Sequence, residues 1–138
     1  MPSDPKHAAI AILARRDHSI REMRQKLKKK EFSEDTITET ITWLLQKNLL
    51  DDHVFAEKKA ESIFRTKLVG PRYIWMKLKG AGVAEETIEN VISDIASEDE
   101  WNERATQAIV QWKKVNPKHA KDTIRHHRFL ASRGFELF

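Results

Sequence analysis

The chain has 138 residues, of which 40% are hydrophobic and 33% charged, with 25 Lys and Arg against 21 Asp and Glu. The chain has only four Gly and four Pro, and this low content favours a soluble helical protein over a turn-rich β protein. The absence of cysteine excludes disulfides and cysteine zinc sites, and no apolar run approaches the roughly 20 residues that span a bilayer. We therefore expect a cytoplasmic protein that contacts no membrane.

The charge is unevenly distributed along the chain. Residues 1–50 carry ten Lys and Arg against seven acids, residues 51–100 carry seven against eleven, and residues 101–138 carry eight against three. A formal net charge of +4 is modest for a protein that binds nucleic acid alone, because phosphate binding grows with the number of cations placed together. Basic ends around an acidic middle suit a partner that combines protein and nucleic acid.

Three helices are predicted in residues 1–50. The first, over residues 5–16, has an apolar side made of its alanines, Ile10 and Leu13. Ser19 and Glu22 have capping-box spacing and start a second helix. Its apolar stripe consists of Ile20, Met23 and Leu27. Ser33 caps a third helix, followed by acids that suit its positive end. The inward-facing residues of this helix are Ile37, Ile41, Leu44 and Leu45.

Residues 48–56 join two helical segments with almost no spacer. Leu49 and Leu50 continue the apolar stripe of the third helix. Asp51 or Asp52 can cap the next helix, and Phe55 begins its buried face. The helices on the two sides must therefore pack as neighbours.

The same pattern returns in residues 51–98, with helices predicted at about 52–67, after Gly70-Pro71 and after Gly82. Adding 51 to the core positions of the first set gives those of the second: Ser19 to Gly70, Met23 to Ile74, Leu27 to Leu78, Phe32 to Val83, Ile37 to Ile88 and Ile41 to Ile92. Like residues at one constant offset indicate an internal repeat.

A third copy is traceable in residues 99–138. One helix should end before Pro117, because the residue before a proline disfavours helical geometry. A further helix is marked by Ile124, Phe129 and Leu130. The closing helix of this copy should begin near Glu136. Either the third copy lacks that helix or the natural chain is longer, and the cost of an unpaired apolar face favours a longer chain.

The expected fold is all-α, an elongated, curved array of tandem three-helix units of helix-turn-helix or homeodomain-like size. The units are residues 1–50, residues 51–98 and a partial third at residues 99–138. This architecture serves DNA reading and protein docking alike. The predicted third helices expose acids such as Glu34 and Glu86, which phosphate would repel, so reading of a DNA sequence is disfavoured.

Basic residues gather instead on the predicted second helices and nearby turns. In a curved array they would form a stripe, here called the basic stripe, that suits contact with a nucleic-acid backbone. For any one of these residues, an ordinary solvated face is the alternative. The candidates are Arg16, Arg24, Lys26, Arg65, Lys67, Arg72, Lys77, Lys121, Arg125 and Arg128.

Other candidate sites are weaker. Asp51 and Asp52 could bind a metal, but helix capping explains both acids and we expect no metal. His126 and His127 are assigned to the basic face, and the tryptophans to core or joint packing, with Trp75 the one whose exposure matters. The sequence has no Gly-rich phosphate loop, no nucleophile elbow and no paired carboxylates among apolar strands, so neither an enzyme nor a cofactor is expected.

Four segments resemble motifs of the RecX family of bacterial regulators of the RecA recombinase. They are Arg16-Asp17-His18-Ser19-x-x-Glu22-Met23-x-x-Lys26-Leu27, Leu49-Leu50-Asp51-Asp52-x-x-Phe55-Ala56, Gly70-Pro71-Arg72-x-Ile74-x-x-x-Leu78-x-x-x-Gly82-Val83, and Phe129–Phe135. The segments occur in the family's order and cover nearly the whole chain. Glu31 and Asn48 stand where the family commonly has glycine, which predicts two less sharp turns.

The resemblance implies an inhibitor or modulator of RecA that lies in the groove of the RecA filament on single-stranded DNA and also contacts the DNA backbone. It would suppress strand exchange, ATP hydrolysis and LexA coprotease activity in DNA repair and the SOS response, acting as a monomer. Our hypothesis is that filament affinity resides in Arg72, Lys77, Arg125 and Arg128. Two alternatives stay open, a free DNA-binding protein that uses the basic stripe without RecA and an α-solenoid scaffold for another protein.

Overall fold

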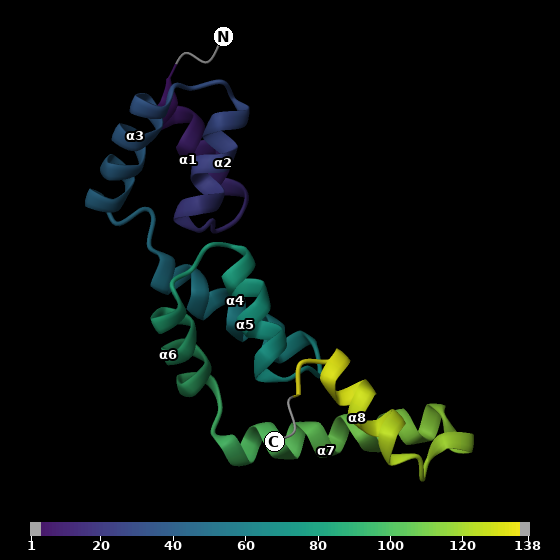
Figure 1. The fold of residues 1–138 in the computed structure, drawn as a ribbon. Coiled ribbons are helices and arrows are strands. Elements are labelled where there is room, and N and C mark those ends of the chain that lie inside the picture. The colour runs from purple at the N-terminus through teal and green to yellow at the C-terminus, as the bar shows by residue number, and fades with distance from the viewer. Residues whose placement is uncertain (1–3, 136–138) are drawn as a thin grey trace.

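The computed structural model describes residues 4–135, and within this range the chain contains helices and turns but no strand. The elements form an elongated array that bends toward its C-terminal end (Figure 1). Their bounds are α1 Pro5–Arg15, α2 Ile20–Lys29, α3 Glu34–Gln46, α4 Asp52–Thr66, α5 Pro71–Gly80, α6 Glu85–Ile95, α7 Glu98–Val115, the 3-10 helix η1 Pro117–His119, and α8 Thr123–Ser132. The all-α, tandem three-helix prediction is confirmed.

Each set of helices encloses its own core. Helices α1, α2 and α3 contact one another and form the first bundle, α4, α5 and α6 form the second, and α7 packs on α8. The positions that the repeat pairs as equivalent are buried in both bundles, because Met23, Ile74, Leu27 and Leu78 all have 0% of their surface exposed. Three small cores in series, the third between α7 and α8, therefore replace one large core.

Side-chain caps start most of the helices. Ser19 and Glu22 form the predicted capping box of α2, and Ser33 caps α3 by accepting from the Thr36 amide. Asp51 caps α4 by accepting from the His53 and Val54 amides. A second capping box at Ser97 and Glu100 starts α7 and was not predicted.

The turns at Glu31 and Asn48 are as sharp as a glycine would make them, contrary to expectation. Glu31 has a φ of 69° and Asn48 a φ of 56°, both in the left-handed region. Gly82 and Gly134, with φ of 87° and 83°, follow α5 and α8 as Glu31 follows α2. A left-handed L residue costs about 1–2 kcal/mol, which the surrounding helix packing offsets.

Four residues predicted to lie on apolar faces are exposed instead. Ile10 is 42% exposed, Leu45 40%, Leu49 44% and Ile124 64%. In α1 the buried positions are Ala9 and Ile12 instead. An alanine-rich helix leaves the direction of its apolar face ambiguous, because alanine is apolar on every side. The predicted closing helix from Glu136 lies outside the described residues.

Candidate functional site

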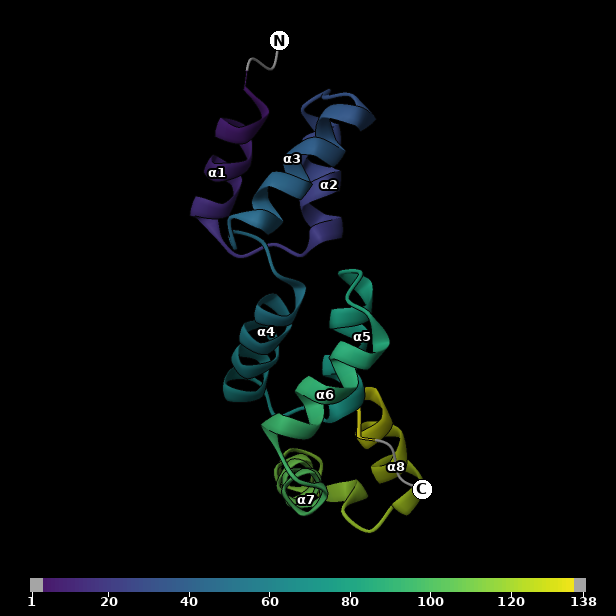
Figure 2. The same ribbon diagram turned by 90° about the vertical axis from the view of Figure 1, so that its left-hand side faces the viewer.

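The three second helices lie on one side of the array. In Figure 1, α2, α5 and α8 follow the inner side of the bend while α3 and α6 lie on its outer side, and Figure 2, turned by 90°, again shows α2, α5 and α8 along one side. These helices carry six of the predicted basic residues, all exposed or half-buried: Arg24, Lys26, Arg72, Lys77, Arg125 and Arg128.

Acidic side chains are exposed on the outer helices. Helix α3 exposes Glu34, Asp35 and Glu39, and α6 exposes Glu85, Glu86, Glu89 and Asp94. The molecule therefore divides its charge across its width, with basic second helices inside the bend and acidic third helices outside it.

Four candidate cations already pair with a carboxylate. Arg24 lies 3.4 Å from Glu34, Arg65 lies 3.7 Å from Glu61, and Arg125 lies 3.1 Å from Asp122. Arg16 lies 3.1 Å from Glu22, within the contact between the first two bundles. Exposed pairs contribute only about 0–1 kcal/mol, so a stronger anionic partner can displace the first three.

Three candidate cations lie over aromatic rings. The Lys67 Nζ donates to the Tyr73 hydroxyl at 2.9 Å and lies 5.2 Å from the ring centroid, and the Lys77 Nζ lies 5.5 Å from the same centroid. Arg72 stacks over Trp75 at 4.9 Å. The hydrogen bond from Lys67 is the main cause that lowers the pKa of Tyr73 below its ordinary value.

Three remaining candidates, Lys26, Lys121 and Arg128, are exposed and form no ion pair with any residue in the range 4–135. Lys121 lies between η1 and α8 rather than on a second helix. Six candidates thus lie on the second helices and Arg16 lies at the contact between the first two bundles, while Arg65 lies on α4, Lys67 directly after α4 and Lys121 shortly before α8. Their role in partner binding stays a prediction.

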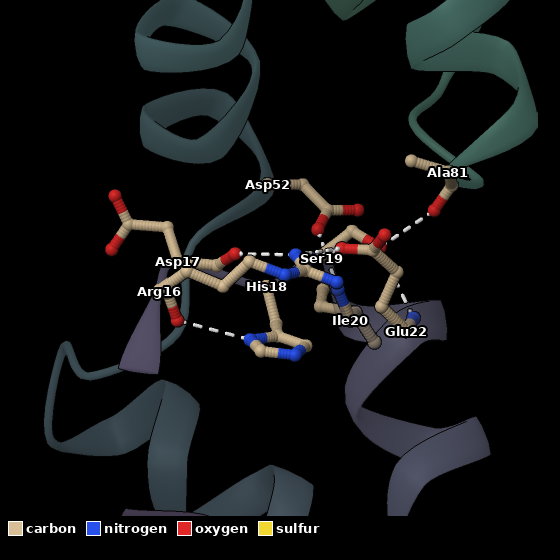
Figure 3. A network of polar contacts seen from close by, with 8 residues as sticks. All are labelled: Arg16, Asp17, His18, Ser19, Ile20, Glu22, Asp52 and Ala81. Atoms are coloured by element: carbon tan, nitrogen blue, oxygen red, sulfur yellow. Dashed lines mark hydrogen bonds and ion pairs between the residues drawn. The ribbon is translucent and has the colours of Figure 1, made fainter. Parts of the chain in front are cut away.

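The first and second bundles meet through a polar joint, which we call the first joint (Figure 3). The buried Ser19 hydroxyl donates to the Ala81 carbonyl oxygen at 2.6 Å. The Ile20 amide donates to the Asp52 carboxylate at 2.7 Å, and the Arg21 guanidinium donates to the Gly80 carbonyl. Asp52 therefore holds the neighbouring bundle, while Asp51 does the capping.

Three titratable groups of the first joint have shifted pKa values. Burial raises the pKa of Asp52, and the hydrogen bond from Ile20 only partly offsets it. Burial also acts to raise the pKa of Glu22, but hydrogen bonds from Arg16 and the Ser19 amide outweigh it and lower that pKa. Burial lowers the pKa of His18, whose Nδ1 lies 3.0 Å from the Arg16 carbonyl oxygen.

The second joint, between the second bundle and α7–α8, repeats this arrangement with backbone atoms. The Gly70 amide donates to the Arg133 carbonyl at 2.8 Å, and the Arg72 amide donates to the Gly134 carbonyl at 3.0 Å. Gly70 is equivalent to Ser19, and a Cβ at residue 70 would overlap the carbonyl of Gly134. Close approach therefore explains why glycine stands at residue 70.

Apolar contacts also cross the second joint. Trp101 of α7 belongs to the core of the second bundle and meets Phe64 edge-on at 5.3 Å. Leu68 packs in turn against the α7–α8 core. The apolar core of the first bundle consists only of residues up to Leu50. The second joint is thus apolar and polar together, whereas the first is built from polar contacts.

The predicted motif residues have structural roles. Leu50 closes the first core with 3% exposure, and Phe55 is buried in the second with 5%. Gly82 has positive φ and lies against Arg21, so any Cβ there would be 2.8 Å from the Arg21 Cβ. Its role combines a left-handed turn with close packing.

Four residues in these contacts were missed or given no separate role by sequence reasoning: Arg21, Tyr73, Arg104 and Arg133. Arg104 donates to the carbonyls of Phe64 and Lys67 at 3.1 and 2.7 Å and so closes the end of α4. Only the repeat offset could have found Arg133, because it precedes Gly134 as Ala81 precedes Gly82. His126 was misassigned, since its Nε2 is buried and its ring meets Trp112 edge-on at 5.3 Å.

Within residues 4–135, no helix combines the length and the apolar character needed to cross a membrane. In the same range, no cluster of three or more His, Asp or Glu side chains is arranged to hold a metal ion.

Comparison with known proteins places both bundles. Residues 6–44 match the family described as RecX, first three-helix domain, and residues 51–92 match RecX, second three-helix domain. "Regulatory protein RecX" of Vibrio parahaemolyticus is 33% identical over 134 residues, which is 96% of this chain and 84% of the relative. The protein of the same description from Clostridium botulinum is 33% identical over 136 residues, and this chain spans 62% of its length.

Solved structures show the same fold. The crystal structure of RecX from Lactobacillus salivarius superposes with a TM-score of 0.81 at 21% identity, over 96% of this chain and 86% of that one. A second solved structure, described as regulatory protein RecX, gives a TM-score of 0.85 at 19% identity, over 96% of this chain and 69% of that one.

Proposed function

The chain belongs to the RecX family of regulatory proteins, and from that membership we propose that it binds the RecA nucleoprotein filament on single-stranded DNA and inhibits RecA. It would lie in the filament groove across neighbouring protomers and reduce strand exchange, ATP hydrolysis and LexA coprotease activity. No catalysis by the chain itself is involved.

The observation that supports this proposal is the alignment of α2, α5 and α8 on one side of a curved array (Figures 1 and 2). A helical filament presents the same surface at regular intervals, and an array of similar units can contact several copies at once. Several weak contacts on one rigid body then act together through effective concentration. Acidic outer helices would face away from the phosphates, because like charges repel.

The basic residues of the second helices would supply the contacts to DNA phosphates. Their contribution should weaken with added salt, because each neutralised phosphate releases counterions. Three cations, one from each second helix, suit this role best because they lack an ion-pair partner among the described residues: Lys26, Lys77 and Arg128.

The direct test is RecA-dependent ATP hydrolysis on single-stranded DNA, measured with increasing amounts of this chain. Hydrolysis should fall as the chain approaches the concentration of filament. An unchanged rate at saturating chain, together with filaments that do not retain it in a pull-down, would refute the proposal.

A further inference from the structure

A hollow of about 660 Å³ lies at the second joint, between the end of α4, the start of α5 and the facing sides of α7 and α8. Its volume falls in the range of small-ligand sites. It adjoins the basic second helices, and two of the basic candidates described above, Lys67 and Lys77, lie in its lining or beside it.

Three aromatic side chains line this hollow, which we call the aromatic hollow: Tyr73, Trp112 and Phe129. The Trp112 ring is fixed from two directions, by His126 edge-on at 5.3 Å and by Phe129 at 5.9 Å with 33° between the planes. A cluster of rings from α5, α7 and α8 offers faces on which a flat ligand can stack.

The charged side chains that line the hollow are all cationic. Lys67 and Arg133 contribute to the lining, and the other residues are apolar or carry a neutral polar group. Lys77 adds a third cation beside the Tyr73 ring. No carboxylate among the described residues forms an ion pair with Lys67, Lys77 or Arg133. The hollow therefore favours a ligand that carries both a flat ring and a negative charge.

The walls are held in place without a ligand. Arg104 fixes the segment around Lys67 by donating to the Lys67 carbonyl. On the opposite side, the hydrogen bond from the Gly70 amide to the Arg133 carbonyl fixes the chain. Preorganised walls reduce the ordering cost of binding.

We propose that the aromatic hollow binds one unstacked nucleotide of single-stranded nucleic acid, with the base against Tyr73 and Trp112 and the adjoining phosphate at Lys67 and Arg133. Single strands suit this site because their bases can leave the stack, whereas bases in a duplex are already paired and stacked. The site needs no RecA, so it extends the proposed function and can be tested separately from it.

The test is fluorescence anisotropy of a labelled oligothymidylate of about 15 nucleotides with the full chain and no RecA. Tyr73→Leu should weaken binding roughly 5- to 150-fold, the range expected for loss of one stacked base. Tyr73→Phe keeps the ring and should retain most of the affinity. Trp43→Leu, in which a tryptophan of the first bundle outside the hollow is truncated, is the matched control and should bind as the parent does.

An abasic oligonucleotide of the same length separates stacking from charge. It should bind the parent and Tyr73→Leu equally, because only phosphate contacts remain, while Lys67→Gln with Arg133→Gln should weaken both oligonucleotides. Equal oligothymidylate binding by parent and Tyr73→Leu would overturn the proposal. The proposal would also be overturned if Tyr73→Leu weakened binding of the abasic strand as much as that of oligothymidylate. A third contrary result would be that an acidic tryptophan-containing peptide binds more tightly than oligothymidylate and depends on Tyr73. Failure here with intact inhibition of RecA would leave the proposed function standing.

Discussion

The Ser19 hydroxyl donates a hydrogen bond to the Ala81 carbonyl oxygen across 2.6 Å, joining residues 62 positions apart. One bundle's second helix thereby begins against the end of the next bundle's second helix. The equivalent bond at the second joint runs from the Gly70 amide to the Arg133 carbonyl. The repeat therefore extends to the way its units dock, which sets the curvature of the array.

Replacing Ser19 by Ala tests the first joint. Ser19 is fully buried and its oxygen also accepts from the Glu22 amide, so the change removes a cap and leaves the partly buried Ala81 carbonyl without its donor. We expect a loss of about 1–3 kcal/mol in the free energy of unfolding, measured by urea denaturation. Ser33→Ala removes a cap and an exposed hydrogen bond to the Thr36 hydroxyl, but no contact between bundles, and should cost about 1 kcal/mol. Equal losses in the two variants would show that the Ala81 contact contributes nothing.

Glycine substitutions test the left-handed turns. Glu31→Gly relieves a residue with a φ of 69° and should stabilise the chain by up to about 1 kcal/mol, since the strain relieved exceeds the added flexibility of the unfolded chain. Gly82→Ala should destabilise by more than about 1 kcal/mol, because it meets both positive φ and Arg21.

Gly80→Ala is the matched control for these turns, since nothing lies within 4 Å of the position its Cβ would take. It should be neutral or mildly stabilising in the free energy of unfolding, measured for all three glycine-turn variants by urea denaturation. A destabilisation by Gly80→Ala as large as that by Gly82→Ala would contradict the account of the turn.

His18 makes stability depend on pH near neutrality. Burial lowers its pKa from 6.5, so the folded state favours the neutral ring. The resulting stability is complete above the ordinary value of 6.5 and is lost as the pH falls below it, because the unfolded chain binds the proton more readily. Urea midpoints should fall from pH 7.5 to pH 5.5 more steeply in the parent than in His18→Asn, which stays neutral. Parallel pH profiles would contradict this role.

Charge reversal tests the basic side of the array. The triple change of Lys26, Lys77 and Arg128 to Glu should weaken inhibition of RecA at least about tenfold, because one cation is lost from each second helix. The matched control reverses Lys47, Lys59 and Lys114, at the end of α3, on α4 and on α7, for the same change in net charge. Both variants should keep the parent's helical circular dichroism. If the two triple variants lost inhibition equally, the affinity for the filament would depend on net charge and not on the basic side of the array.

The helices and repeat could be predicted from sequence because their signals are local. Capping residues such as Ser19 and Ser33 are recognised within one short segment. The repeat is recognised from the constant offset between equivalent residues of the two bundles. Burial in α1 could not be predicted, since alanines gave its apolar face no clear direction. Asn48 and Glu31 were expected to blunt their turns, but helix packing on both sides imposes the left-handed backbone.

The candidate site was less predictable because it depends on contacts between units. The offset identifies Gly70 with Ser19 but does not say that each docks on the following unit's turn. The aromatic hollow is assembled from the segment after α4 and from α5, α7 and α8, and Arg104 acts there through carbonyls that carry no sequence signal. The side of the array on which the cations lie depends on the rotation between successive units. Only the structure shows that rotation.

The most direct measurement of the central claim is a competition for the labelled full chain between RecA filaments on single-stranded DNA and the same DNA without RecA, at about 150 mM salt. We predict binding to the filament about tenfold tighter or more, with naked DNA a poor competitor. Equal or tighter binding to naked DNA would contradict the account and identify the chain as a free DNA-binding protein.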